Sequence, residues 1–227
     1  MRMAGGTAIV IGGAQGSGRA LSRALTGAGA RVIVTDPDAG VAATFAQGIG
    51  QQGLACDPGD GAALARLAGE AGDADLVLLA LDGSGGDAAL LARSVAATVA
   101  GAVAHLAPVL EARGGGALLC VLTLSPAPDP WQEAAAGWLG AATVALSARL
   151  AARRVRVNAV VALADDAPPL PRFMAARAAA PAPQVPLAAL PGPRAIAAAA
   201  LSLCGEDAAA VTGQVLRLDG GRGAATA

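Results

Sequence analysis

Apolar and polar positions along the chain follow two spacings in turn, one typical of buried strands and one typical of helices. Short apolar or β-branched runs predict strands at 8–11, 31–35, 53–56, 75–81, 117–122, 155–161 and 214–218. Longer Ala- and Leu-rich stretches predict helices at 19–28, 41–47, 62–71, 88–113 (broken near Pro108), 133–153 and 194–204. Strands that alternate with helices form parallel sheets covered on both faces. We therefore predict an α/β fold with a doubly wound parallel sheet of about seven strands.

The segment from Asp165 to Pro193 interrupts this alternation. It holds more than half of the 14 prolines, and it reads as irregular with one short helix at 173–179. The remaining pattern shows no repeat and no linker, and 227 residues suit one α/β domain with a single core. We expect a single domain over residues 1–227.

Composition adds one open question. Apolar residues make up 55% of the chain, which also contains 31 glycines. A genomic base bias would explain this excess of Ala and Gly. Helix faces that are buried between subunits would explain it equally well, so both explanations stay open.

Charge and cysteine usage exclude several classes of function. A formal net charge of −1 with scattered arginines leaves no electrostatic footprint for nucleic acid. No uninterrupted apolar run reaches the ~18 residues of a membrane span, and residues 1–8 lead into a strand without a signal-peptide pattern. The three cysteines lack metal-ligand spacing. We expect a cytoplasmic protein with reduced thiols, no metal site, and no nucleic-acid or membrane partner.

The clearest chemical motif is a glycine-rich loop between the first predicted strand and the first predicted helix. Gly12, Gly16 and Gly18 allow a tight turn and a close approach to a pyrophosphate at a helix N-terminus. Asp36, at the end of the second strand, can accept a hydrogen bond from a ribose 2′-hydroxyl, which favours NAD over NADP. Both features also have a purely structural interpretation, which stays open. Gly18 would let the first helix pack closely on the sheet, and Asp36 would cap the turn at Pro37.

These motifs resemble the short-chain dehydrogenase/reductase family. The spacing Gly-x-x-x-Gly-x-Gly is similar to the glycine motif of that family, and VTGQVLRLDGG at 211–221 is similar to its terminal signature. VRVNA at 155–159 matches the strand after its catalytic helix, and Cys56-Asp57 matches the aspartate that meets the adenine. The resemblance implies a Rossmann-type domain with NAD-binding positions at Gly12, Gly16, Gly18, Asp36 and Asp57.

The resemblance also implies hydride transfer between nicotinamide and a carbonyl or alcohol, yet of the four side chains that perform it only a hydroxyl, on Thr123, is kept. The family uses a Tyr as general acid/base, a Lys four residues later, a Ser on the fifth strand and an Asn on the fourth helix. The corresponding positions hold Ala136, Gly140, Thr123 and Thr98. The chain contains no tyrosine, and all 16 basic residues are arginine. General acid–base catalysis is worth about 10²–10⁴-fold, and these positions hold no side chain that could act as the acid or the base. We therefore predict that this chain has no catalytic residues.

Other departures fall on the same side of the expected site. The family's Asn-Asn-Ala-Gly turn is replaced by LALD at 79–82, whereas the adenine-side positions keep their pattern. We expect that this chain requires no cofactor. Whether vestigial NAD binding remains is left open.

Three isolated residues carry two interpretations each. His105 is the single histidine, either catalytic or simply packed in its helix, and Asp82 is either a functional carboxylate or a solvated residue of a polar turn. Trp138 lies two residues past Ala136 and so points to the opposite helix face. It is either an anchor for a neighbouring subunit or part of the core.

The sequence supports three hypotheses of function. The first is a non-catalytic subunit that assembles with an active dehydrogenase paralogue, or with itself. By analogy, such a complex could act on a hydroxyacyl-CoA, as in anaerobic toluene (benzylsuccinate) degradation. The second is a nucleotide-sensing or ligand-binding module. The third is an NAD-dependent oxidoreductase with displaced catalysis, using Thr123 with Asp82 or His105.

Overall fold

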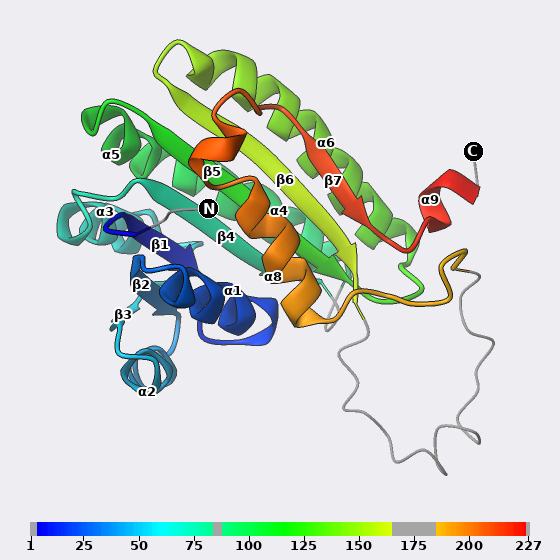
Figure 1. The fold of residues 1–227 in the computed structure, drawn as a ribbon, viewed down its shortest axis with the longest axis horizontal. Coiled ribbons are helices and arrows are strands. Elements are labelled where there is room, and N and C mark those ends of the chain that lie inside the picture. The colour runs from blue at the N-terminus through cyan, green and yellow to red at the C-terminus, as the bar shows by residue number, and fades with distance from the viewer. Residues whose placement is uncertain (1–3, 84–87, 165–184, 226–227) are drawn as a thin grey trace.

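The computed structural model describes residues 4–83, 88–164 and 185–225, and its centre is one parallel sheet (Figure 1). The strand order is β3-β2-β1-β4-β5-β6-β7, and every neighbouring pair is parallel. This confirms the predicted doubly wound α/β fold. The strands are β1 (Thr7–Ile11), β2 (Arg31–Asp36), β3 (Gln52–Ala55), β4 (Leu76–Asp82), β5 (Gly116–Leu124), β6 (Val155–Leu163) and β7 (Val215–Leu218).

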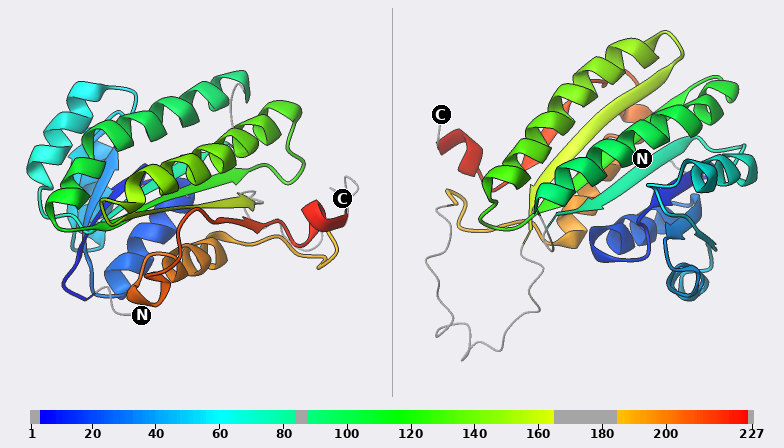
Figure 2. Two further views of the ribbon diagram at one scale, coloured as in Figure 1. Left: turned by 90° about the horizontal axis from the view of Figure 1, so that it is seen from above. Right: turned by 180° about the vertical axis from the view of Figure 1, so that it is seen from behind.

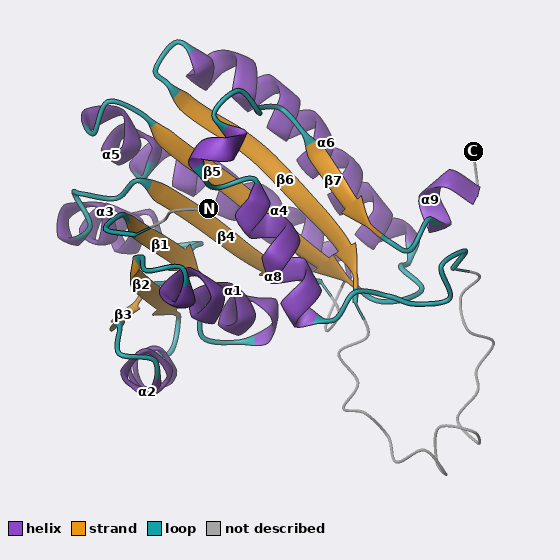
Figure 3. Ribbon diagram, viewed as in Figure 1, coloured by secondary structure: helices purple, strands orange, loops and turns teal. Residues whose placement is uncertain are grey.

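Helices cover both faces of the sheet, because its central strands are apolar on both sides (Figures 2 and 3). One core forms against α1 (Gly16–Gly27), α2 (Ala39–Gly48) and α8 (Pro193–Ser202). The other core forms against α3 (Gly61–Glu70), α4 (Ala88–His105), α5 (Ala107–Ala112) and α6 (Pro130–Ala151). A short 3₁₀ turn, η1 (Glu206–Ala208), and a terminal helix, α9 (Arg222–Ala225), complete the described elements.

Helix boundaries follow local capping chemistry. The long helix predicted at 88–113 is divided into α4 and α5 at Leu106, and Pro108 stands in the first turn of α5, where its missing N–H is tolerated. Asp129 caps α6 in a capping box with Gln132. The sequence pattern did not predict η1 or α9. The helix expected at 173–179 lies outside the described residues.

The similarity of 211–221 to a family signature has a structural cause, since this stretch ties β7 to β6. Asn158 is buried; its Nδ2 donates to the carbonyl of Val211 (2.9 Å) and its Oδ1 accepts from the amide of Gln214 (3.0 Å). The Thr212 hydroxyl accepts from the amide of Val157 (3.0 Å). These bonds satisfy backbone groups that the four-residue strand β7 leaves unpaired.

Two stretches are long and apolar enough to cross a membrane by length and composition alone. They are Leu90–Ala112 and Pro130–Ala151, with mean hydropathies of 1.5 and 1.2. Both lie side by side on one face of the sheet, and each buries part of its surface there (Figure 2). Core helices of soluble proteins pass the same test, so this feature is weak evidence for a membrane.

The packing of α1 against the glycine loop predicts a position-specific effect of adding one methyl group. A Cβ on Gly18 would collide with the carbonyl oxygen of Gly12, whereas a Cβ on Gly27 in the same helix would meet nothing within 4 Å. We expect Gly18→Ala to lower the free energy of unfolding by about 2 kcal/mol or more. Gly27→Ala should be neutral or stabilising by up to about 1 kcal/mol. Urea unfolding of both variants checks this, and equal effects would contradict the packing role.

Candidate functional site

The glycine loop lies where the order of the strands reverses direction. The chain leaves β1 for β2 and β3 on one side and returns to β4 on the other, which is where open α/β sheets bind ligands. Gly12 and Gly16 adopt left-handed conformations (φ 70° and 46°), which favour glycine. A Cβ on Gly12 would lie 2.6 Å from the carbonyl oxygen of Ala80, so a larger residue would separate the loop from β4.

A pocket of about 300 Å³ opens beside this loop, at the carboxyl ends of β1, β2 and β4. It brings together four of the five predicted cofactor-binding residues: Gly12, Gly16, Gly18 and Asp36. Asp57 is not among the lining residues. The complete lining is Ile11, Gly12, Gln15, Gly16, Ser17, Gly18, Asp36, Pro37, Pro58, Ala80, Leu81 and Asp82.

Asp36 is 3% exposed, and both of its carboxylate oxygens are engaged within the chain. Oδ1 accepts from the amide of Asp38 (3.0 Å), which confirms the turn-capping interpretation. Oδ2 accepts from Nε2 of Gln15 (2.9 Å). A carboxylate oxygen can accept a further hydrogen bond, so the ribose-binding role stays a prediction. Sequence reasoning missed Gln15, whose only signal is its place inside the glycine loop.

Asp57 is exposed and serves a local turn. Its Oδ1 accepts from the amide of Gly59 (2.8 Å), two residues before α3 begins. Its neighbour Pro58, rather than Asp57 itself, lines the pocket. The predicted adenine contact of Asp57 therefore stays untested.

Asp82 is exposed, as its solvated interpretation expects, but it is the last residue of β4 rather than part of a turn. It also lines the pocket. Its Oδ1 lies 3.5 Å from the hydroxyl oxygen of Thr123. Its Oδ2 lies 3.3 Å from the point where a Cβ on Gly16 would stand. The pairing of β4 with β5 causes this, because it sets Asp82 beside Thr123.

The four positions that the resemblance assigns to the family's catalytic residues lie on α4, β5 and α6. Thr123 is 1% exposed, and its hydroxyl lies 3.3 Å from the carbonyl oxygen of Leu81, to which it can donate. Ala136 is buried against the sheet, and Thr98 is buried on α4. A Cβ on Gly140 would meet only Val215, at 3.8 Å, so α6 leaves space for a side chain there.

The structure brings Thr123 together with Asp82 but does not bring His105 to them. His105 is the last residue of α4, and its Nε2 lies 3.3 Å from the Cβ position of Gly61, at the start of α3. A pair formed by Thr123 and His105 therefore has no support in the geometry.

Gln132 is a second residue that sequence reasoning missed. Its Nε2 donates to the carbonyl of Gly83, and its Oε1 accepts from the Ser125 hydroxyl (2.7 Å) and the Asp129 amide (3.1 Å). These bonds fix the start of α6 to the end of β4. The pattern Asp-x-x-Gln at 129–132 is the signal that could have identified it.

The cysteines are almost entirely in the thiol form near neutral pH, because their pKa values are raised. Burial, together with the charge of Asp57, raises the pKa of the Cys56 thiol to about 11. Burial raises the pKa of the Cys120 and Cys204 thiols to about 12. Among the described residues, no group of three or more His, Cys, Asp or Glu side chains is arranged to hold a metal.

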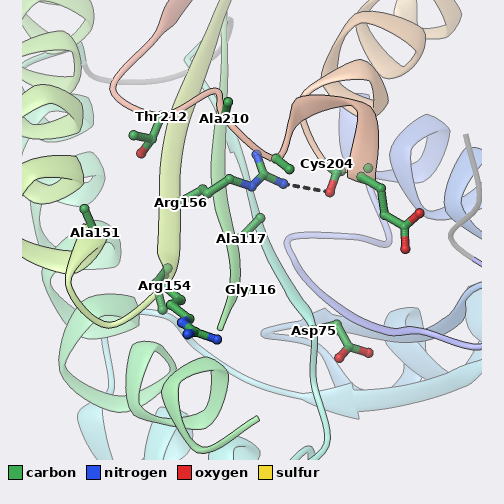
Figure 4. A pocket seen from close by; sticks show the side chains of 13 residues that line it. Asp75, Gly116, Ala117, Ala151, Arg154, Arg156, Cys204, Ala210 and Thr212 are labelled. Atoms are coloured by element: carbon green, nitrogen blue, oxygen red, sulfur yellow. Dashed lines mark hydrogen bonds between the residues drawn. The ribbon is translucent and has the colours of Figure 1, made fainter. Parts of the chain in front are cut away.

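A second pocket, of about 570 Å³, is built around Arg154 and Arg156 (Figure 4). Arg156 donates from Nη1 to the carbonyl of Leu203 (2.8 Å) and from Nη2 to the carbonyl of Cys204 (2.9 Å). Its guanidinium therefore ties the residues after α8 to β6, as a structural contact.

The glycine loop fits the phosphate part of a nucleotide cofactor. The left-handed glycines and the close packing at Gly12 form a cradle that a side chain would fill, and glycine loops of this kind let the backbone approach a pyrophosphate. On the other side, the chain lacks the lysine that holds the nicotinamide ribose in the family that the sequence resembles.

Comparisons with known proteins agree with the parallel α/β fold and with the family resemblance of the glycine loop. Residues 12–222 match the family described as enoyl-(acyl carrier protein) reductase. The structure of 3-ketoacyl-(acyl-carrier-protein) reductase from Brucella melitensis, complexed with NADH, is 26% identical and superimposes with a TM-score of 0.74. That match covers 97% of this chain and 99% of that chain. No curated protein matches the sequence.

Two further solved structures show the same likeness. A short chain dehydrogenase/reductase family protein is 28% identical with a TM-score of 0.79, and the match covers 98% of this chain and 100% of that chain. Hydroxysteroid dehydrogenase from Escherichia coli is 25% identical with a TM-score of 0.76, and the match covers 97% of this chain and 96% of that chain.

The raised thiol pKa values predict slow alkylation of the folded protein. A pKa of about 11 instead of about 8.5 lowers the thiolate fraction at pH 8 more than about hundredfold. We expect iodoacetamide to label Cys56, Cys120 and Cys204 far more slowly in buffer than in urea, with labelling of Cys56 rising as the pH approaches 11. Mass spectrometry of each cysteine measures this. A cysteine labelled equally fast in both conditions would be a free nucleophile.

Proposed function

The chain belongs to the short-chain dehydrogenase/reductase family, and we propose that it serves as a non-catalytic subunit that assembles with an active dehydrogenase of the same fold. The observation that carries this proposal is the state of the catalytic positions. The resemblance assigns the family's catalytic residues to positions on α4, β5 and α6. None of the residues at these positions is ionisable: they are Ala136, Gly140, Thr123 and Thr98. The scaffold of the site is intact, and its acid and base are missing.

Hydride transfer to a carbonyl needs a proton donor, and among the described residues no ionisable side chain stands at the position of Ala136 or Gly140. Ala136 is 2% exposed and packs against the sheet. The hydroxyl of Thr123 lies within reach of a backbone carbonyl and of Asp82. A threonine hydroxyl is by itself a weak acid and a weak base near neutral pH, and its contact with the Asp82 carboxylate, at 3.5 Å, is long. The weak acidity of this hydroxyl favours a non-catalytic role for the chain over turnover by the chain alone.

The surface that supports assembly is a groove of about 760 Å³ between α4 and α6, which we call the α4–α6 groove. Trp138 on α6 is 41% exposed at this groove, on the helix face opposite the buried Ala136. Val144 on the same helix is 57% exposed. The groove is lined by Val99, Ala100, Val103, Ala104, Pro108, Trp138, Ala141, Ala142, Ala145, Leu146, Arg149, Leu150 and Arg153.

The chemistry of this groove favours a partner that presents two similar helices. Only 39% and 33% of the two apolar helical windows is buried within the chain, so much apolar helix surface remains exposed. Alanines line both sides of the groove, and small side chains let helices approach closely. A large exposed aromatic residue such as Trp138 is a typical interface anchor. A dehydrogenase of the same fold offers a matching pair of helices, and a second copy of this chain is the alternative occupant.

The substrate of such a complex would follow the active partner. The solved relative from Brucella melitensis is a 3-ketoacyl-(acyl-carrier-protein) reductase. A partner that acts on an acyl thioester, such as a hydroxyacyl-CoA, is therefore our proposal for the complex.

Assembly through the groove predicts a variant that loses the partner while remaining folded. We expect Trp138→Ser to weaken binding to the partner by about thirtyfold or more, as removal of a central aromatic anchor does. Val41→Ser, which changes an apolar residue of similar exposure on α2, should leave binding unchanged. Co-expression with dehydrogenases encoded nearby, followed by co-purification and biosensor titration, measures both. A stable homo-oligomer that binds none of these dehydrogenases would refute the proposal.

A second candidate function has one observation in its favour, the 3.5 Å approach of Thr123 Oγ1 to Asp82 Oδ1. An oxidoreductase with displaced catalytic residues would use this pair as hydroxyl and base. Our first proposal predicts no NADH- or NADPH-dependent turnover by the pure chain above the uncatalysed rate. Steady-state assays with acyl thioester and ketone substrates test this. Turnover that is present in the wild type and vanishes in Thr123→Val would establish the second candidate instead.

A further inference from the structure

The pocket of about 570 Å³ around Arg154 and Arg156, which we call the arginine pocket, lies at the edge of the sheet opposite the glycine loop (Figure 4). Its walls come from the first residues of β5 and β6 and from the chain that follows α8. Because all the strands are parallel, this edge holds their amino ends. We propose that the arginine pocket binds a small organic anion, which Arg154 and Arg156 hold by its phosphate or carboxylate group.

Arg154 stands in a backbone conformation that favours glycine. Its φ is 58°, in the left-handed region, where a side chain is strained. Its amide donates to the carbonyl of Ala151 (2.9 Å) and its carbonyl accepts from the amide of Gly116 (3.1 Å), which fixes this turn after α6. Its side chain is exposed, and within the described chain its guanidinium forms no hydrogen bond or ion pair. No contact of the guanidinium there offsets the strain, and a bound anion would do so.

Arg156 brings a second guanidinium to the same pocket, and this one is half-buried. It donates to the backbone carbonyls of Leu203 (2.8 Å), Cys204 (2.9 Å) and Val211 (3.3 Å). A guanidinium has more N–H groups than these bonds use, so donors remain for a ligand. None of the described carboxylates forms an ion pair with it. Burial lowers the pKa of Arg156, because its charge has lost water without gaining a carboxylate.

Two carboxylates also line the arginine pocket, but only one of them opposes an anion. Asp75 is neutralised by Arg113, whose Nη2 lies 3.1 Å from Oδ1, and its Oδ2 accepts from the amide of Thr7 (2.9 Å). Glu206 is exposed on η1 and forms no ion pair within the described chain. Two guanidiniums therefore stand against one carboxylate that is not neutralised, and the pocket keeps a net positive charge.

The rest of the lining indicates which class of anion fits. It consists mainly of small apolar side chains, those of Ala117, Ala151, Val155, Ala209 and Ala210. A volume of about 570 Å³ suits a small organic molecule and exceeds what a bare inorganic anion needs. Arginine forms paired hydrogen bonds with the oxygens of phosphates and carboxylates. The ligand class is therefore a phosphate monoester or a carboxylate that carries a small apolar group.

NMR titration of four proteins tests this inference: the wild type, Arg154→Gly, Glu206→Gln and Arg66→Gln. Arg154→Gly removes one guanidinium and places glycine at a left-handed position, so it should fold at least as well as the wild type, which urea unfolding checks. Arg66 is exposed on α3, outside the pocket lining, and its variant makes the same change in net charge. Each protein is titrated with phenyl phosphate, benzoate and the neutral benzyl alcohol at constant ionic strength.

We expect phenyl phosphate or benzoate to bind the wild type and to shift the amide resonances of residues 154–156 and 204–210. The anion that binds more tightly identifies the preferred anionic group. Arg154→Gly should bind it about tenfold more weakly, because a hydrogen bond to a charged group is lost. Glu206→Gln should bind it at least about twofold more tightly, because a negative charge is removed from the pocket. Arg66→Gln should bind it as the wild type does.

The inference would be overturned if neither anion bound the wild type, or if Arg154→Gly or Glu206→Gln kept the wild-type affinity. Equal affinity for benzyl alcohol and for the anions would also overturn it, because the pocket would then be an apolar cavity. A loss in Arg66→Gln as large as that in Arg154→Gly would have the same meaning, as an effect of net charge alone. Assembly through the α4–α6 groove is measured separately, so the two proposals can fail independently.

Discussion

Burial of the parallel sheet on both faces is the constraint on which the rest of the structure depends. The central strands β1, β4, β5 and β6 are apolar along nearly their whole length, so each face must be covered by helices. Parallel strands need crossover helices, and these bring the carboxyl ends of all strands to one edge. The glycine loop, Asp36, Asp82 and Thr123 meet at that edge for this reason. The site is thus a consequence of covering the sheet, whatever chemistry its side chains provide.

The two sides of this edge differ in the side chains that they present. On the loop side, Gly12, Gly16 and Gly18 retain a backbone geometry that no residue with a Cβ could adopt without strain or collision. On the opposite side, α6 begins with its capping box, and Ala136 and Gly140 stand where the family resemblance would place an acid and a clamp. A helix that stays in place without its reactive side chains still supplies a surface. Trp138 is exposed on the outer face of α6, which is the surface that we propose for assembly.

Much of the site was accessible from the sequence because it depends on local backbone chemistry. Gly12, Gly16 and Gly18 were identified from spacing, and the pocket contains all three with Asp36. Gln15 was missed, because its role comes from a contact across the loop. The sequence offered Thr123 with either Asp82 or His105, and only the pairing of β4 with β5 shows that Asp82 is the one beside Thr123. The contacts of Gln132 with Gly83 and Ser125 are likewise invisible in sequence order.

The sequence by itself determined the α/β class, the alternation of strands and helices, the glycine loop and the absence of tyrosine and lysine. Hydrophobic periodicity and residue identity encode these features directly, because they require no knowledge of what lies opposite. Only the tertiary structure decided that Asp36 is held by Gln15, that His105 lies away from Thr123, and that Trp138 is exposed. It also placed a carboxylate at the loop. Such features depend on which residues meet across the fold, and sequence spacing does not carry that information.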